Sequence, residues 1–156
     1  MLMKCVGIRC SNTDFSYAIL SGKKSDPKLE TCDTIVFPKG YTRPQALRWF
    51  LQELEGLSKR HSSPSVWAIK GTEAMAAKGK EFVERVENEA MVIFHASNAG
   101  VTKVVRKVKS TIAKDLGLTG KASALKTDLD TSVLHGFKDA TEKVKDAILI
   151  AWSELR

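Results

Sequence analysis

Three strand-forming runs, joined by two short polar segments, fill the first 37 residues and restrict how the rest of the chain can fold. The runs are Lys4–Cys10, Phe15–Leu20 and Leu29–Phe37. The joining segments 11–14 and 21–27 are rich in Ser, Asn, Asp, Gly and Pro, which favour turns. Short connections between consecutive strands are typical of antiparallel pairing. The N-terminal part is therefore predicted to form an antiparallel meander.

Helical and strand patterns alternate over the rest of the chain. Thr42 and Gln45 have the spacing of a helix capping box, and Val66–Ile69 is an apolar run typical of a central strand. The further elements expected, in chain order, are a helix over Glu73–Asn88, a strand over Ala90–His95, a helix over Val101–Leu116, an ambiguous segment over Lys121–Gly136 and a last helix capped near Asp139. This order predicts an α/β fold with a mixed five-stranded sheet and helices on both faces.

Length and composition indicate a folded protein without a membrane segment. The chain has 156 residues, of which 43% are hydrophobic, so one domain over residues 1–156 is expected. No run approaches the roughly 18 apolar residues that span a bilayer, and no signal peptide is recognised at the start. The three cysteines lack metal-ligand spacing and are expected to be reduced. We therefore expect a cytoplasmic protein with no membrane partner.

Positive charge is concentrated in one segment. The net charge is +7, and the segment from Lys103 to Lys126 holds seven lysines and arginines against the single acid Asp115. Such clustering is typical of phosphate contact, although a solvated helix face is the alternative interpretation. The candidate nucleic-acid-binding residues on the expected helix are Lys103, Arg106, Lys107, Lys109 and Lys114.

Short motifs at the ends of the expected elements resemble a known fold. They are Gly7-Ile8-Arg9 in the first strand, Ala68-Ile69-Lys70 in the fourth, the segment 92–103, and Lys145-Asp146-Ala147 in the last helix. In this order they resemble the ribonuclease H-like fold and, within it, the RuvC-type resolvase branch. The chain is also similar to a small bacterial group of RuvC-like proteins of unknown function, in which a lysine likewise ends the fourth strand.

The resemblance places bases where the family carries metal-binding acids. The matching positions are Arg9, Lys70, Lys143 and Asp146, and only the last keeps a carboxylate. Two-metal nucleases hold hard divalent ions with carboxylates and water. Exchanging an acid for a base turns an attraction of roughly 4 kcal/mol per unit charge pair into a repulsion. The resemblance therefore implies a catalytically degenerate site without metal, in which Asp146 pairs with Arg9 or Lys70.

The leading functional hypothesis is a non-catalytic domain that binds DNA, RNA or a protein that handles nucleic acid. Binding would use the basic segment and no cofactor, because no Gly-rich phosphate loop for a small-molecule cofactor is present. The bases at Arg9, Lys70 and Lys143 would then be available to hold a phosphate.

Two alternatives stay open. The first is a magnesium-dependent nuclease with displaced acids at Asp14, Glu73 and Asp146, although the sequence favours interpreting Asp14 as a turn residue and Glu73 as a first-turn helix acid. The second is a protein-interaction scaffold. Because RuvC-type relatives are often dimers, the resemblance also implies a homodimer.

Overall fold

One mixed sheet organises the structure, a computed structural model that describes residues 3–61 and 64–156. Its strands are β1 (Lys4–Cys10), β2 (Asp14–Lys23), β3 (Asp26–Val36), β4 (Val66–Lys70) and β5 (Lys103–Lys107). They lie in the order β3-β2-β1-β4-β5. The first three strands pair antiparallel, and β4 and β5 continue the sheet parallel to β1. The predicted α/β fold class is confirmed.

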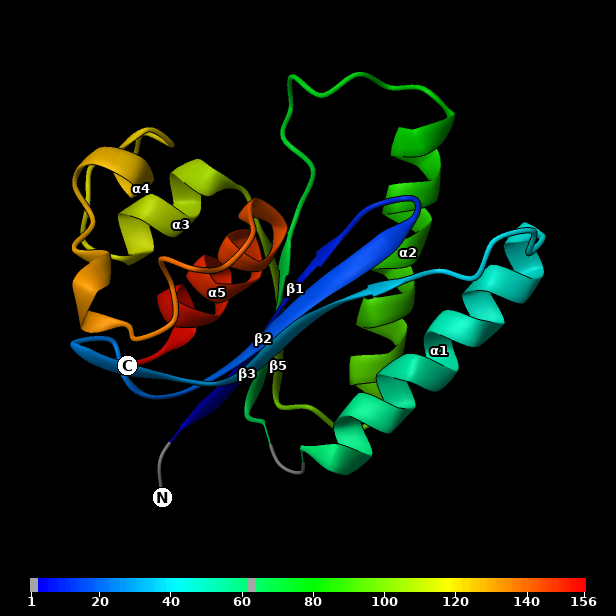
Figure 1. The fold of residues 1–156 in the computed structure, drawn as a ribbon, viewed down its shortest axis with the longest axis horizontal. Coiled ribbons are helices and arrows are strands. Elements are labelled where there is room, and N and C mark those ends of the chain that lie inside the picture. The colour runs from blue at the N-terminus through cyan, green and yellow to red at the C-terminus, as the bar shows by residue number, and fades with distance from the viewer. Residues whose placement is uncertain (1–2, 62–63) are drawn as a thin grey trace.

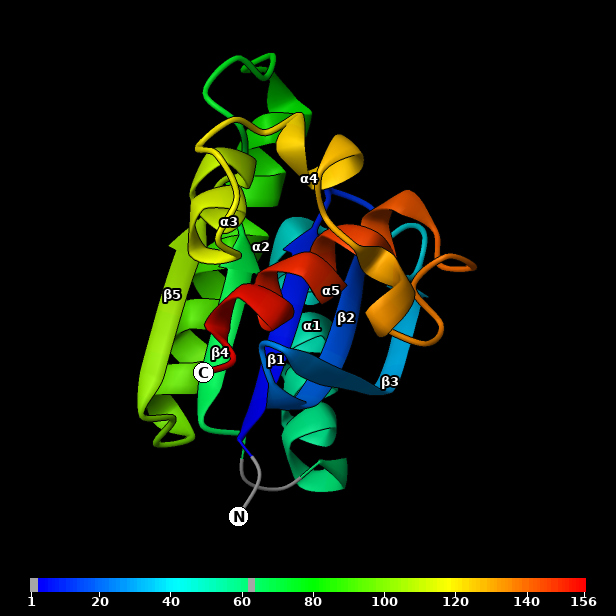
Figure 2. The same cartoon turned by 90° about the vertical axis from the view of Figure 1, so that its left-hand side faces the viewer.

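Helices cover both faces of the sheet, as predicted. Helices α1 (Arg43–Arg60) and α2 (Lys80–Asn98) pack on one face, and α5 (Glu142–Glu154) crosses the other beside α3 (Lys109–Asp115) and α4 (Ala124–Thr127) (Figures 1 and 2). A short 3-10 turn covers Thr131–Val133. Each face buries its own hydrophobic core. In the described part of the chain, no helix is long and apolar enough to cross a membrane.

Two helix starts test the capping predictions. At α1 the capping box is present. The Thr42 hydroxyl accepts a hydrogen bond from the backbone N–H of Gln45, and the side-chain Oε1 of Gln45 accepts one from the backbone N–H of Thr42. At α5 the prediction was wrong, because Thr141, not Asp139, is the cap. Its hydroxyl oxygen accepts from the Val144 amide nitrogen at 3.3 Å.

The expected boundaries after β4 were wrong, although the number of strands was right. Residues 71–79 form a loop where a helix was expected, and the predicted strand Ala90–His95 lies inside α2. Buried Val92, His95 and Ala96 follow helical spacing there. The fifth strand instead comprises Lys103–Lys107, inside the region expected to be helical. A short apolar run fits either structure, so tertiary packing decides between them.

The turn expected over residues 21–27 is also shorter in the structure. Strands β2 and β3 continue through most of it, and only Lys24 and Ser25 form the connection. Gly22 supplies a positive φ of 97° within this hairpin end. Pro27 is accommodated because β3 is an edge strand, which does not need every backbone donor.

Helix α5 approaches β1 closely at Gly7. A Cβ atom built on Gly7 would lie 1.9 Å from the backbone oxygen of Ala147 and 3.0 Å from the Cβ of Ala151. Only glycine therefore permits this contact. Arg9 follows Gly7 on the same face of β1, and Asp146 precedes Ala147, so the contact brings these two charged side chains together.

Replacing Gly7 with alanine is expected to destabilise the protein by about 3 kcal/mol, because the backbone of α5 must move away from β1. Gly120→Ala is the matched control, since a Cβ there meets no atom within 4 Å. Urea unfolding of both variants measures the difference. Equal stabilities would show that α5 does not depend on the glycine.

His95 joins α1 and α2. Its side chain is 5% exposed, its Nε2 lies 2.7 Å from the Ser58 hydroxyl, and its ring packs on Trp67. Burial lowers the pKa of His95 below its ordinary value of 6.5, with Glu55 acting weakly in the opposite direction. The folded protein therefore disfavours the protonated ring.

The unfolded chain binds this proton more readily than the folded protein does. The contribution of His95 to the free energy of unfolding should therefore be fully present above pH 6.5. It should decrease as the pH falls below that value, by up to about 1.4 kcal/mol per pH unit. Half-buried His61, whose pKa is also lowered by burial, contributes in the same direction. In His95→Gln the slope should decrease. Urea unfolding from pH 7.5 to 5 tests this, and an unchanged slope in His95→Gln would contradict it.

Candidate functional site

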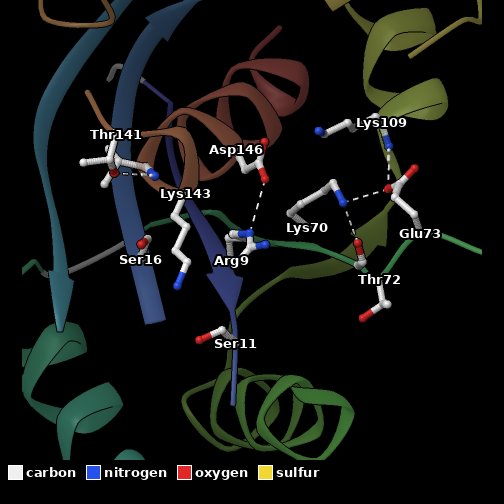
Figure 3. Close-up of polar contacts among 12 residues, drawn as sticks. Arg9, Ser11, Ser16, Lys70, Thr72, Glu73, Lys109, Thr141, Lys143 and Asp146 are labelled. Atoms are coloured by element: carbon white, nitrogen blue, oxygen red, sulfur yellow. Dashed lines mark hydrogen bonds and ion pairs between the residues drawn. The ribbon is translucent and has the colours of Figure 1, made fainter. Parts of the chain in front are cut away.

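Charged side chains gather where β1 and β4 end beneath the first turns of α5. Arg9 is near the carboxyl end of β1, Lys70 ends β4, and Lys143 and Asp146 lie one helical turn apart on α5. Figure 3 shows these four side chains in one region, with Arg9 directed toward Asp146 and Lys70 toward Glu73. The family resemblance implies that these residues lie near one another, and in the structure they lie around the same ends of β1, β4 and α5.

Arg9 and Asp146 form the central ion pair. The guanidinium Nε lies 3.2 Å from Oδ2 of Asp146, and the two side chains are 20% and 15% exposed. The Nη1 atom of Arg9 is buried and has no hydrogen-bond partner among the described residues. Of the two partners expected for Asp146, Arg9 takes this role.

Lys70 is paired with Glu73. The lysine is 3% exposed, and its Nζ donates to the Gly71 carbonyl and to Oε2 of Glu73, both at 2.7 Å. Burial lowers the pKa of Lys70, although the hydrogen bond to Glu73 opposes this. Burial acts to raise the pKa of Glu73, but the hydrogen bond and charge of Lys70 outweigh it and hold that pKa below its ordinary value. The Lys109 amide nitrogen also donates to Glu73, at 3.3 Å.

Lys143 is paired with Asp14. Its Nζ lies 2.8 Å from Oδ2 and 3.0 Å from Oδ1 of the aspartate, which is 14% exposed. The Ser11 hydroxyl donates to Oδ1 of Asp14 at 2.6 Å and accepts from the Asp14 amide nitrogen. Asp14 therefore has two roles: it forms the turn expected from the sequence, and it pairs with the ammonium group of Lys143.

The three pairs form one charge-balanced group, the ion-pair cluster: Arg9–Asp146, Lys70–Glu73 and Lys143–Asp14. The three acids of the alternative nuclease hypothesis, Asp14, Glu73 and Asp146, each pair with one of these bases. Within residues 3–61 and 64–156, no group of three or more His, Cys, Asp or Glu side chains has a metal-binding arrangement. A divalent ion entering here would meet cations that already neutralise the carboxylates.

The basic segment does not form one helix face, so that expectation was wrong. Because β5 alternates its side chains, Lys103 and Lys107 point toward Glu154 of α5, whereas Arg106 points to Glu89 of α2. Lys107 also binds Asp115, at 2.7 Å. These three candidates therefore have carboxylate partners.

Lys109 and Lys114 of the same segment lie on α3. In the described part of the chain, neither has a carboxylate within ion-pair distance. The Lys109 side chain extends toward Asp146 in Figure 3. Of the five residues predicted to bind nucleic acid, these two keep their charge available.

A cavity of about 340 Å³ beside Asp146 was not foreseen. It lies between α5 and the segment 122–137, which showed no clear periodicity in the sequence. Its lining combines residues far apart in the chain, from Lys109 to Leu149. No sequence signal marks such a site, because packing of short elements on α5 creates it.

Arg9→Met and Asp146→Leu are each expected to cost about 2–3 kcal/mol, because each leaves a partly buried charge unpaired. The double variant should cost less than the sum, with a coupling of about 1–2 kcal/mol. Urea unfolding measures all three. The Lys80–Glu84 pair serves as control: its 3.8 Å separation and its 88% exposed lysine predict a coupling below about 0.5 kcal/mol. Additive effects at Arg9 and Asp146 would show that the pair contributes nothing.

Comparisons with known proteins agree on the fold. No protein-family model and no curated protein sequence matches this chain. Among solved structures, Thermus thermophilus RuvC has a TM-score of 0.78 at 16% identity, covering 97% of this chain and 92% of that one. T. thermophilus RuvC in complex with Holliday junction substrate has a TM-score of 0.73 at 14% identity, covering 97% and 91%. The yeast mitochondrial Holliday junction resolvase has a TM-score of 0.66 at 12% identity, covering 97% and 77%. The sheet order, the helices on both faces and these matches identify the fold of this chain as ribonuclease H-like, of the RuvC type.

Proposed function

We propose that this chain is a catalytically degenerate RuvC-like domain that binds nucleic acid without cleaving it. The observation that carries the proposal is the ion-pair cluster, in which each carboxylate at the sheet edge is neutralised by a base. The similar fold of a RuvC structure with Holliday junction substrate supports nucleic acid as the ligand class.

The charge balance opposes metal-dependent cleavage. Two-metal catalysis requires carboxylates that are free to hold divalent ions about 4 Å apart. Here a metal would have to expel an ammonium or guanidinium group from each carboxylate, and each such unit pair is worth roughly 4 kcal/mol at a surface-like dielectric. Buried Lys70 has little room to withdraw, since its side chain is 3% exposed.

The same balance argues against phosphate binding by Arg9, Lys70 and Lys143. Their charges are matched by three carboxylates, so the ion-pair cluster offers a phosphate no net attraction. Phosphate contact is better placed on α3. Lys109 and exposed Lys114 have no carboxylate partner among the described residues, and α3 lies on the same sheet face as α5 (Figure 2).

Binding of a four-way DNA junction by the full chain is expected at low salt in the presence of EDTA, with affinity that falls steeply as salt increases. Lys109→Ala/Lys114→Ala should weaken binding by about tenfold and reduce the salt slope by about two. Lys28→Ala/Lys59→Ala, which removes two exposed lysines from β3 and α1, should change neither. Gel mobility shifts from 25 to 200 mM salt measure this.

Two outcomes would overturn this proposal. If neither DNA nor RNA is bound at low salt, the scaffold hypothesis is favoured. If magnesium supports cleavage that Asp146→Asn abolishes, the chain is instead a nuclease that uses Asp14, Glu73 and Asp146. A homodimer stays a prediction; the large apolar side chains Val83, Ile93 and Phe94, exposed on α2, are consistent with it.

A further inference from the structure

The 340 Å³ cavity beside the ion-pair cluster has an apolar floor. Its size falls in the range of about 300–1,000 Å³ that is typical of small-molecule sites. The floor consists of buried Leu125, Phe137 and Leu149 with half-buried Leu129. Asp146 lies in both the cavity wall and the cluster, so the cavity adjoins the sheet edge where the charged residues gather.

The rim of the cavity is positively charged, in contrast to the neutral cluster. It carries Lys109, Lys126 and Lys145. The Lys145 ammonium lies 5.4 Å from the centre of the Phe137 ring and 3.9 Å from the Glu142 carboxylate. No carboxylate of the described residues lies within ion-pair distance of Lys109 or Lys126. The rim therefore has positive charge that its own acids do not neutralise.

Two polar groups complete the lining. The Thr131 hydroxyl can donate or accept a hydrogen bond, and the exposed Glu142 carboxylate can accept from an amino group. An apolar floor, a few polar groups and a cationic rim together suit a flat, partly apolar molecule that bears an anion. A duplex is too large to enter a cavity of this size.

We propose that this cavity binds one unpaired nucleotide, with the base on the apolar floor and its phosphate at Lys109 and Lys126. The inference rests on the proposed nucleic-acid function and deepens it. The chain would hold junctions or single strands by receiving a base displaced from its stack, while exposed Lys114 of α3 contacts a neighbouring phosphate. Glu142 and Thr131 would contact the edge of the base.

The first experiment tests the cavity without any polymer. Calorimetric titration of the full chain with dAMP should show binding about tenfold tighter than with deoxyadenosine or inorganic phosphate, since each of these supplies only part of the match. Ala122→Phe, at an exposed lining position, should fill the cavity and weaken dAMP binding by about tenfold without disturbing the core. Lys126→Ala should weaken it several-fold.

The matched control is Ala99→Phe, which adds the same ring at an exposed position at the end of α2 and should not change dAMP binding. If dAMP binds no more tightly than phosphate, or binds equally to wild type and Ala122→Phe, the proposal is wrong. If Ala122→Phe does not fold, the dAMP affinity of Lys126→Ala still tests the proposal. Lys126 is exposed, so its truncation should leave the core intact.

The second experiment separates the cavity from the proposed function. A junction that carries one unpaired 2-aminopurine should increase in fluorescence on binding wild type but not Ala122→Phe, while gel shifts show that both still bind the junction. Junction binding with the same fluorescence change in both proteins would overturn the cavity proposal alone. Binding of dAMP that is sensitive to Ala122→Phe, without junction binding, would support the cavity and overturn the nucleic-acid function.

Discussion

The packing of α5 directly on β1 at Gly7 determines the geometry of everything around it. Because the Ala147 backbone occupies the space that a Cβ of residue 7 would need, the helix lies much closer to the sheet than side chains normally allow. That close approach places Asp146 over Arg9 and brings Lys143 to Asp14. It also sets one wall of the cavity, since Leu149 lies on the same helix.

Each carboxylate of the ion-pair cluster at the sheet edge lies against a base of the same chain. Carboxylates gathered at such an edge repel one another unless cations lie between them, and divalent ions are one solution. Here lysine and arginine side chains supply the cations from within the chain, at 2.7–3.2 Å. These three pairs leave the cluster with no net charge. Any attraction for an anionic polymer would therefore come from neighbouring residues such as Lys109 and Lys114 of α3, which have no carboxylate within ion-pair distance in the described part of the chain.

Sequence patterns predicted the fold well where a single local signal dominated. The meander and the capping box at Thr42 depend on contacts close in the chain, and the strand at Val66 is marked by an unbroken apolar run. The fifth strand was misplaced because Ala90–His95 fits a strand or a helix equally well, and because the valines of Lys103–Lys107 fit a helical stripe. Tertiary contacts, not their own pattern, decided between the two: Lys103–Lys107 pairs with β4, and Val92, His95 and Ala96 are buried at helical spacing.

The sequence by itself determined the order of the elements, the five-stranded mixed sheet and the gathering of Arg9, Lys70, Lys143 and Asp146 at one edge. Only the tertiary structure decided which acid each base would bind. It also divided the β5 cations between two faces and created the cavity beside Asp146. The physical reason is that periodicity records contacts with near neighbours, whereas the pairs Arg9–Asp146 and Lys143–Asp14 join residues 137 and 129 positions apart, whose distances depend on packing.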